Sequence, residues 1–267
     1  MNNILHVTDY LKEQIRAQGG DPQRETLDFV CAKSGEPYFI DSFGEYWRAY
    51  HFVEDAYALE EVKDPQDFYQ SAVAFGNFQR MLADFPADTL TETIAGFHDT
   101  KARFVAFEKA VEEDVCGRAA GVQQEIRFIK DRYDVACVLG DLLEAGELPL
   151  RVTHNDTKSN NVLMDNATGK GLCVIDLDTV MPGLAVNDFG DSIRFGASTG
   201  AEDEKDLSRV SCDMELYDIY AKGFVEGCGG ALTDMEIECL PIGAKVMTYE
   251  CGICLLYTSP SPRDGAT

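Results

Sequence analysis

The chain has 267 residues, of which 47 are acidic and 23 are basic, and its formal net charge is −24. A surface this acidic repels nucleic acid and anionic membranes, so we expect neither as a partner. Nine cysteines without the spacing of a disulfide framework, and the lack of a secretory segment, favour a cytoplasmic protein with free thiols. No apolar run approaches the ~18 residues that a membrane span requires.

The first part of the chain predicts a helix followed by strands. Apolar residues recur at helical spacing from Ile4 to Ile15, and Gly19-Gly20 ends this helix. We expect a polar turn at Asp21 to Arg24. Turn residues then separate three strand-like runs, which are Leu27–Val30, Tyr38–Ile40 and Tyr46–Val53.

The next hundred residues predict helices. Asp64-Pro65 is an N-cap with proline in the first turn, and an apolar stripe from Phe68 to Leu82 follows it. A further helix is expected from Val122 to Leu143. Between them lies His98, which by itself is most simply a structural histidine in a packed environment.

The stretch from Arg151 to Gly196 carries the chemistry. It contains His154-Asn-Asp156, then Asn161, then two strand patterns joined by a turn at Asp165–Gly169, and finally Asp176. Phosphoryl transfer needs such a set: one carboxylate accepts the proton of the attacking hydroxyl, and an amide with a second carboxylate binds Mg²⁺. Any loop and hairpin could carry Asp and Asn, but the joint spacing favours the functional interpretation.

Several residues of this stretch have two readings. We expect His154 to brace the loop, because Asp156 is better placed to act as the base. Lys158 either contacts the transferring phosphoryl group or is a solvated lysine. Asp178 is either a second metal ligand or an orienting residue, and Arg194 either pairs with a carboxylate or reaches a substrate.

Asp188-Phe-Gly190 spells the metal motif of protein kinases, and we interpret it as a structural feature. Asp176 follows Asp156 by 20 residues, which suits a metal carboxylate beyond a hairpin, whereas Asp188 follows it by 32. No G-x-S-x-G motif or other nucleophile triad is evident.

The C-terminal third predicts more helices. One apolar face runs from Leu207 to Phe224, and Gly227–Gly230 breaks it. Thr233 to Glu236 is a capping box that opens a helix toward Ile242, and a further helix begins at Ala244. Residues 254–267 change to a Ser/Pro/Gly-rich composition, and we expect this tail to be non-native.

The motifs THNDTKSNNVLMD and VIDLDT resemble those of the aminoglycoside phosphotransferase and choline kinase superfamily, and most closely its N-acetylhexosamine 1-kinases. The resemblance extends from about Asn3 to Ile253. It implies that Asp156 is the catalytic base, that Asn161 and Asp176 bind Mg²⁺, and that Asp188 accepts backbone N–H groups. It also implies ATP as phosphoryl donor and the anomeric hydroxyl of a sugar as acceptor.

The resemblance further implies an α+β, two-lobed, protein-kinase-like fold. We expect residues 1–54 to form part of the small lobe, with Phe52, Val53, Glu54 and Asp55 at the adenine, and residues 55–253 to form a mostly helical large lobe. His98 becomes a candidate acceptor-site residue. The strands and glycine-rich phosphate loop that would begin the small lobe have no counterpart, so we expect a truncated chain.

Two alternatives stay open at this stage. The first is a related kinase for another small hydroxyl compound, such as choline, an aminoglycoside or a methylthiopentose. The second is an inactive nucleotide-binding fragment.

Overall fold

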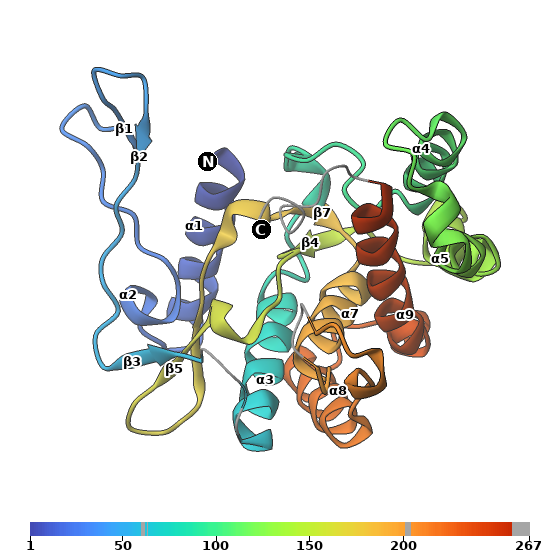
Figure 1. The fold of residues 1–267 in the computed structure, drawn as a ribbon. Helices are drawn as coiled ribbons and strands as arrows, with labels where there is room; N and C mark the ends of the chain where they lie inside the picture. Colours follow the sequence, from blue (N-terminus) through green and yellow to red (C-terminus); the bar gives the residue numbers. More distant parts are fainter. Residues whose placement is uncertain (60–61, 63, 201–203, 258–267) are drawn as a thin grey trace.

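The structure is a computed structural model, and it describes residues 1–59, 62, 64–200 and 204–257. The described part is mostly helical (Figure 1). The α-helices are α1 (Asn2–Ala17), α2 (Pro22–Glu25), α3 (Pro65–Met81), α4 (Thr100–Glu113), α5 (Gln123–Lys130), α6 (Tyr133–Glu144), α7 (Ala185–Gly196), α8 (Met214–Cys228) and α9 (Asp234–Tyr257). The strands are β1 (Phe39–Ile40), β2 (Tyr46–Trp47), β3 (Ala56–Ala58), β4 (Arg151–Thr153), β5 (Val162–Asp165), β6 (Gly171–Val174) and β7 (Met181–Gly183).

The strands pair in three small antiparallel sheets, and two of them frame one loop. The predicted hairpin is present as β5 and β6, and β3 adds to it in the order β3-β5-β6. Strand β4 pairs with β7, with Thr153 opposite Met181. The segment between β4 and β5 therefore starts in one sheet and ends in another, at the middle of the molecule (Figure 1).

Helix α1 forms as predicted and buries its apolar stripe. Its buried side chains pack with residues of α3, β4 and the segment after β6, in a cluster that includes Phe78, Val152 and Leu177. This cluster therefore contains residues from both sides of the lobe boundary that was predicted between residues 54 and 55. The boundary remains a prediction. The predicted polar turn is instead the short helix α2, because Asp21 caps it by accepting the N–H of Gln23.

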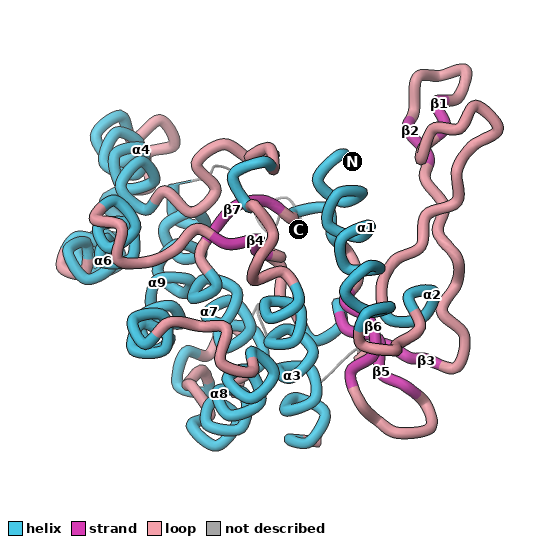
Figure 2. Tube along the Cα trace, turned by 180° about the vertical axis from the view of Figure 1, so that it is seen from behind, coloured by secondary structure: helices cyan, strands magenta, loops and turns pink. Residues whose placement is uncertain are grey.

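The strands predicted before residue 54 are longer than those in the structure. Leu27–Val30 forms only an isolated bridge between Phe29 and Tyr50, and the predicted strand Tyr46–Val53 shrinks to Tyr46–Trp47. The reason is that residues 30–52, here called the hairpin arm, stand away from the helical body (Figure 2). Both residues of β1 and both of β2 are exposed, so the arm buries no face that would extend the strands.

Helices α3 and α8 pack closely against each other in the core. Asp64 caps α3 by accepting the N–H of Gln66, as predicted. Two glycines of α8 lie against the backbone of α3: a Cβ atom at Gly223 would overlap the carbonyl oxygen of Tyr69, and one at Gly227 that of Val73. The small residues thus allow the two backbones to touch.

Three predicted helices have different limits. The helix expected from Val122 to Leu143 is broken between α5 and α6, although both halves bury side chains in one cluster. The face expected from Leu207 begins only at α8, which Asp213 caps, and Leu207 itself is 78% exposed. The two helices expected on either side of residue 243 are one helix, α9, which continues through Pro241.

Among the described residues, α9 is the helix that is long and apolar enough by composition to span a membrane. It nevertheless packs along α7 and contributes Leu240, Val246 and Ile253 to the buried clusters. It also carries the buried carboxylates Glu236 and Glu250, which pair with Arg151 and Arg103 respectively. This packing is that of a core helix. Of the predicted tail, residues 254–257 end α9, and residues 258–267 lie outside the described part.

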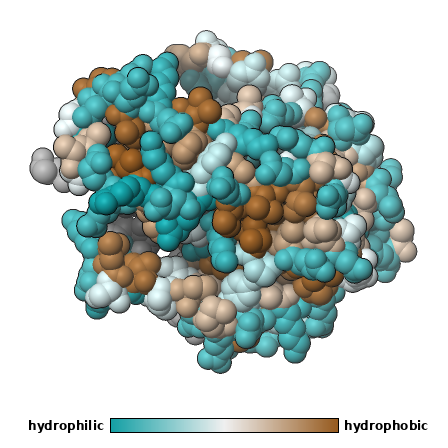
Figure 3. Space-filling view, turned by 90° about the vertical axis from the view of Figure 1, so that its right-hand side faces the viewer, coloured by the Kyte–Doolittle hydropathy of each residue, from teal (hydrophilic) through white to brown (hydrophobic). Residues whose placement is uncertain are grey.

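The face over α4, α5 and α6 mixes hydrophilic and hydrophobic surface (Figure 3). Val105, Phe128 and Val135 contribute exposed apolar side chains from these helices. The high negative charge of the chain therefore does not make the surface uniformly polar.

A buried ion pair fixes β4 against α9. Arg151 donates through Nε and Nη2 to the two carboxylate oxygens of Glu236, at 2.5 and 2.7 Å. Glu236 is 1% exposed and also accepts the N–H of Thr233, whose hydroxyl accepts the N–H of Glu236, so the predicted capping box is confirmed. The hydrogen bond to Glu236 raises the pKa of Arg151.

We expect Glu236→Ala to lower the free energy of unfolding by about 3–5 kcal/mol, because it leaves the guanidinium of Arg151 buried without its carboxylate. Urea denaturation measures the change. Glu108→Ala is the control, because it removes a half-exposed carboxylate paired with Lys130 and should cost less than about 1 kcal/mol. Equal losses in the two variants would contradict the importance assigned to the buried pair.

Candidate active site

The loop after β4 takes a backbone conformation that few residues tolerate. Asn155 has φ 66°, in the left-handed region where Asn costs less than most side chains. Its side-chain amide donates to the carbonyl oxygen of Thr179 at 2.8 Å, and Thr179 Oγ1 donates back to the carbonyl of His154. The loop is therefore tied to the segment that follows β6.

Both ring nitrogens of His154 are engaged. Nε2 lies 2.8 Å from the carbonyl oxygen of Ile175 and must donate to it, so Nδ1 is the acceptor for the N–H of Asp156 at 3.3 Å. The ring is fully buried against Phe75 and Phe78. These contacts are those of a brace between the loop and the end of the hairpin, and they leave no nitrogen free to accept a proton from a substrate.

Asp188 lies beneath the same loop. Its Oδ2 accepts the N–H of His154 at 2.9 Å and the side-chain amide of Gln79 at 2.9 Å, and its Oδ1 accepts the N–H of Asn155 at 2.8 Å. The residue is 2% exposed. Burial raises the pKa of Asp188, and the two backbone N–H groups act in the opposite direction. Asp188 thus has no exposed oxygen to offer a metal, and its structural role remains the interpretation we favour.

The next turn of α7 holds the next part of the loop. Asp191 Oδ2 accepts the N–H of Thr157 at 3.1 Å, and Ser192 Oγ donates to the carbonyl of Thr157 at 2.8 Å. Arg194 donates through Nε and Nη2 to Asp191 Oδ1, so the structure places this candidate substrate residue beside a carboxylate that faces the loop.

Asp156, Lys158 and Asn161 come together at the exposed side of the loop. Asn161 Nδ2 donates to the backbone carbonyl of Asp156 at 2.8 Å and to its Oδ2 at 3.1 Å. Since both partners are acceptors, the amide nitrogen faces Asp156 and Oδ1 points the other way. Lys158 Nζ lies 3.2 Å from Asp156 Oδ1. The carboxylate of Asp156 remains partly exposed, as a group that meets a substrate must be.

Asp176 and Asp178 follow the hairpin on one short turn. Asp176 has φ 58° and is exposed, and the N–H of Ile175 beside it donates to the carbonyl of Asn161 at 2.9 Å. That bond ties the end of β6 to Asn161 at the start of β5. Asn161 and Asp176 therefore lie at the same end of the β5–β6 hairpin.

Asp178 has a partner that the sequence did not suggest. Arg48, at the end of β2, donates through Nη1 and Nη2 to the two oxygens of Asp178, the second at 2.6 Å. This hydrogen bonding lowers the pKa of Asp178. It also raises the pKa of Arg48, and the negative charge of Asp176 acts in the same direction. The two residues are 130 positions apart, and no motif connects them.

His98 lies apart from the loop, in a polar cluster between the start of α4 and the end of α9. Its Nδ1 is 2.7 Å from Glu250 Oε2, and Thr100 Oγ1 donates to Glu250 Oε1 at 2.6 Å. His98 Nε2 is buried without a hydrogen-bond partner among the described residues. Glu250 was not a predicted site residue, although a carboxylate within the apolar second half of α9 is a signal that could have found it.

The four residues predicted at the adenine lie beside the other end of the hairpin. Asp55 accepts, through its carbonyl oxygen, the N–H of Asn166 in the β5–β6 turn at 2.9 Å. Val53 is 6% exposed and Phe52 is 83% exposed, so only the former belongs to the core. Glu54 accepts from Arg24 through its backbone carbonyl. Strand β5 separates this end from Asn161 by about 13 Å at the usual rise of a strand.

The oxygen groups at Asn161 and Asp176 suit Mg²⁺. Magnesium is usually bound by one or two carboxylates together with substrate phosphates and water, and not by an all-protein cage. In the parts of the chain that the structure describes, no three His, Cys, Asp or Glu side chains gather as a metal cage. An exposed carboxylate and an amide oxygen at one end of a hairpin therefore fit a metal that the nucleotide helps to bind.

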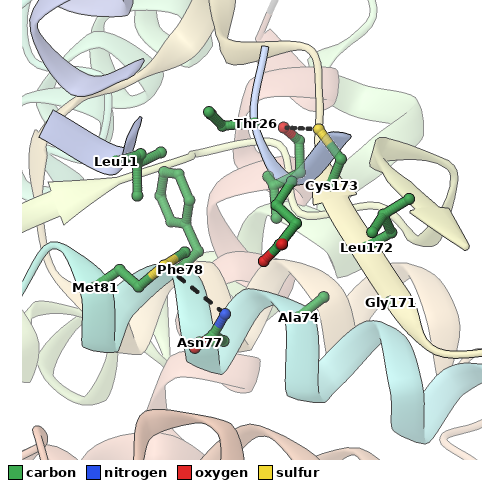
Figure 4. Close-up of a pocket in the computed structure, with 11 residues that line it drawn as sticks. Leu11, Thr26, Ala74, Asn77, Phe78, Met81, Gly171, Leu172 and Cys173 are labelled. Carbon is green, nitrogen blue, oxygen red and sulfur yellow. Dashed lines mark hydrogen bonds between the residues drawn. The ribbon is translucent and has the colours of Figure 1, made fainter. Parts of the chain in front are cut away.

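Two hollows lie away from these residues. A cavity of about 30 Å³ between α1, α3 and β6 is lined by Leu11, Phe78 and Leu172 among others (Figure 4), with room for water and not for a nucleotide. A larger hollow of about 440 Å³ lies against Ile126 and Tyr257 at the end of α9. None of the predicted site residues lines either hollow.

Solved structures of known proteins share the fold of this chain. The chain is similar to a microcompartment-associated aminopropanol kinase (TM-score 0.61, 14% identity, covering 98% of this chain and 76% of that one). It is similar to an aminoglycoside phosphotransferase from Alicyclobacillus acidocaldarius (TM-score 0.63, 14% identity, covering 98% of this chain and 76% of that one). It is also similar to an amicoumacin kinase solved with AMP-PNP and Ca²⁺ (TM-score 0.57, 14% identity, covering 95% of this chain and 71% of that one).

Because these sequence identities are low, the three structures are evidence about the fold alone. They confirm the predicted kinase-like α+β class. The sequence itself matches the model of the phosphotransferase enzyme family over residues 22–221, which is most of the chain. The chain belongs to the phosphotransferase enzyme family.

Proposed function

We propose that this protein transfers the γ-phosphoryl group of ATP, with Mg²⁺, to the anomeric hydroxyl of an N-acetylhexosamine and releases the sugar 1-phosphate. Family membership supports phosphoryl transfer. The sugar acceptor rests on the resemblance of THNDTKSNNVLMD and VIDLDT to N-acetylhexosamine 1-kinases. The observation that carries the proposal is the hydrogen bond from Asn161 Nδ2 to Asp156 Oδ2, because it sets the proposed base beside a proposed metal ligand.

Asp156 is the base of the proposed reaction. Its carboxylate is oriented through Oδ2 by Asn161 and through Oδ1 by Lys158, and it stays accessible to a hydroxyl. As the hydroxyl attacks, Asp156 accepts its proton. Lys158, which lies on the same loop, is placed to stabilise the negative charge of the transferring phosphoryl group.

Asn161 Oδ1 and the carboxylate of Asp176 are the proposed Mg²⁺ ligands, with Asp178 as a further candidate. A Mg²⁺ ion held by these residues would offset the negative charge that develops on the nucleotide phosphates. The hairpin supplies the rigid element: Asn161 and Asp176 lie at one end of it, and Asp55, proposed at the adenine, lies at the other. A nucleotide along β5 would thus reach both ends. The amicoumacin kinase structure, which contains AMP-PNP and a divalent cation, supports this pairing of ligands.

His98 is proposed to meet the acceptor. Glu250 fixes its ring through Nδ1, which leaves Nε2 aimed away from Glu250. A buried ring nitrogen without a partner calls for an explanation, and a functional role is one of the recognised ones. A hydroxyl or the N-acetyl carbonyl of the sugar would supply it. We further propose a cytoplasmic location, where ATP is abundant and the nine cysteines, none of which forms a disulfide bond in the described part of the chain, stay reduced.

The acceptor can be tested directly by ³¹P NMR of the protein with Mg·ATP and GlcNAc or GalNAc. We expect a sugar 1-phosphate signal that depends on both Mg²⁺ and the sugar. Choline, an aminoglycoside and a methylthiopentose serve as competing acceptors in parallel samples. A product with one of them, and none with the N-acetylhexosamines, would move the assignment to the related kinases.

We expect Asp156→Asn to bind Mg·ATP normally and to lower kcat by a factor of about 10² or more, because the amide cannot accept the proton. Initial rates and calorimetric binding measure the two quantities. Asp131→Asn is the control, since it neutralises an exposed carboxylate at the end of α5. Near-normal turnover of Asp156→Asn would rule out the assigned base.

Asp176→Ala and Asp188→Ala should impair different properties, the first Mg·ATP binding and the second stability. We expect Asp176→Ala to fold normally and to weaken Mg·ATP binding, because an exposed metal ligand is lost. Asp188→Ala should reduce the free energy of unfolding by about 1–3 kcal/mol for each buried N–H left without an acceptor. Urea denaturation and calorimetry separate the two effects. A folded Asp188→Ala protein that has lost only metal binding would overturn the distinction.

A further inference from the structure

Arg48 occupies an unusual place for a residue of the hairpin arm. The arm stands off the helical body, yet Arg48 reaches the turn after β6 and holds both oxygens of Asp178. Asp178 is two residues beyond Asp176, the proposed metal ligand. One guanidinium therefore connects a peripheral hairpin to the metal end of the candidate site.

The contact between Arg48 and Asp178 is easily exchanged. The side chain of Arg48 is 35% exposed and that of Asp178 is 53% exposed. Water solvates both partners at such exposure, so an ion pair of this kind adds little stability and its loss costs little. A divalent cation beside Asp176 would compete with Arg48 for the same two carboxylate oxygens.

Charge balance gives Arg48 an alternative partner. Three of the residues proposed for the site, Asp156, Asp176 and Asp178, are carboxylates, and a nucleotide triphosphate adds more negative charge. Lys158 is a cation on the side of the base. Arg48 is a cation on the side of the metal, and its planar fork binds phosphate oxygens in pairs as well as it binds carboxylates.

We propose that Arg48 is a phosphate-binding residue of the nucleotide site, and that it exchanges Asp178 for a phosphate oxygen when Mg·ATP binds. This inference rests on the proposed function, because it requires a nucleotide at the β5–β6 hairpin. It assigns the hairpin arm a role, which is to carry a cation to the phosphates. The arm would then move little, since Arg48 changes partners within the reach of one side chain.

The test compares ligands with and without phosphates. Calorimetry gives the Kd of Mg·ATP and of adenosine for the unaltered protein, Arg48→Met and Arg48→Lys. Arg132→Met is the control, because it removes the charge of an exposed arginine that stacks on Phe128 far from the site. Trp47, the sole tryptophan of the sequence, precedes Arg48 and reports on the arm by its fluorescence.

We expect Arg48→Met to weaken Mg·ATP binding by a factor on the order of ten to a hundred, as the loss of a charge-assisted hydrogen bond does, and to leave adenosine binding unchanged. Arg48→Lys should recover part of the loss. Trp47 emission should respond to Mg·ATP more than to adenosine. Equal weakening for both ligands, or none for Mg·ATP, would overturn the proposal. If the unaltered protein binds neither ligand, the proposed function itself fails.

A second variant keeps the proposal falsifiable if Arg48→Met does not fold. With Mg²⁺ chelated, Asp178→Asn should bind free ATP several-fold more tightly, since Arg48 is released from its carboxylate. Adding Arg48→Met or Arg48→Lys to Asp178→Asn should remove all or part of that gain, as coupled residues require. A gain that persists in full in both double variants would reflect general charge repulsion and would contradict a role for Arg48.

Discussion

The buried carboxylate of Asp188 is the interaction on which the candidate site depends. It accepts the N–H groups of His154 and Asn155, and so fixes the loop at the point where Asn155 enters the left-handed region. A loop with that strained residue would otherwise relax, because its backbone donors would have no acceptor. His154 links the fixed loop to the end of the hairpin, because its ring donates to the carbonyl of Ile175. The loop that carries Asp156, the proposed base, is thereby placed relative to the turn that carries Asp176, the proposed metal ligand.

Helix α7 must itself be held for Asp188 to act. Its packing is close: a Cβ atom at Gly190 would overlap the carbonyl oxygen of Gly243 in α9, and Phe189 is fully buried beside the aromatic rings of α8. Each residue of the Asp188-Phe-Gly190 triplet therefore has a structural partner. The triplet resembles a metal motif in sequence, but its surroundings here are those of a packed helix. The loop thus packs on α7, and α7 packs on α9, beneath the residues proposed to bind the metal.

Local patterns could predict a part of this arrangement. The caps at Asp64 and Thr233 and the β5–β6 hairpin are formed as expected, because each is specified by residues close together in the chain. Strand lengths before residue 54 could not be predicted, since exposure of the arm depends on what packs against it. Arg48 was missed for a related reason: its partner is 130 residues away, and an exposed arginine carries no signal of its own. The proposed roles of Asp156, Asn161 and Asp176 remain predictions that the geometry supports.

The most direct test of this account is to locate the metal. Crystals grown with Mn²⁺ and a non-hydrolysable ATP analogue would show the ion by its anomalous scattering. We predict one peak between Asn161 Oδ1 and the carboxylate of Asp176, within about 2.3 Å of each, with phosphate oxygens completing the coordination. A peak at Asp188, or an analogue bound without any ion at the β5–β6 hairpin, would contradict the account.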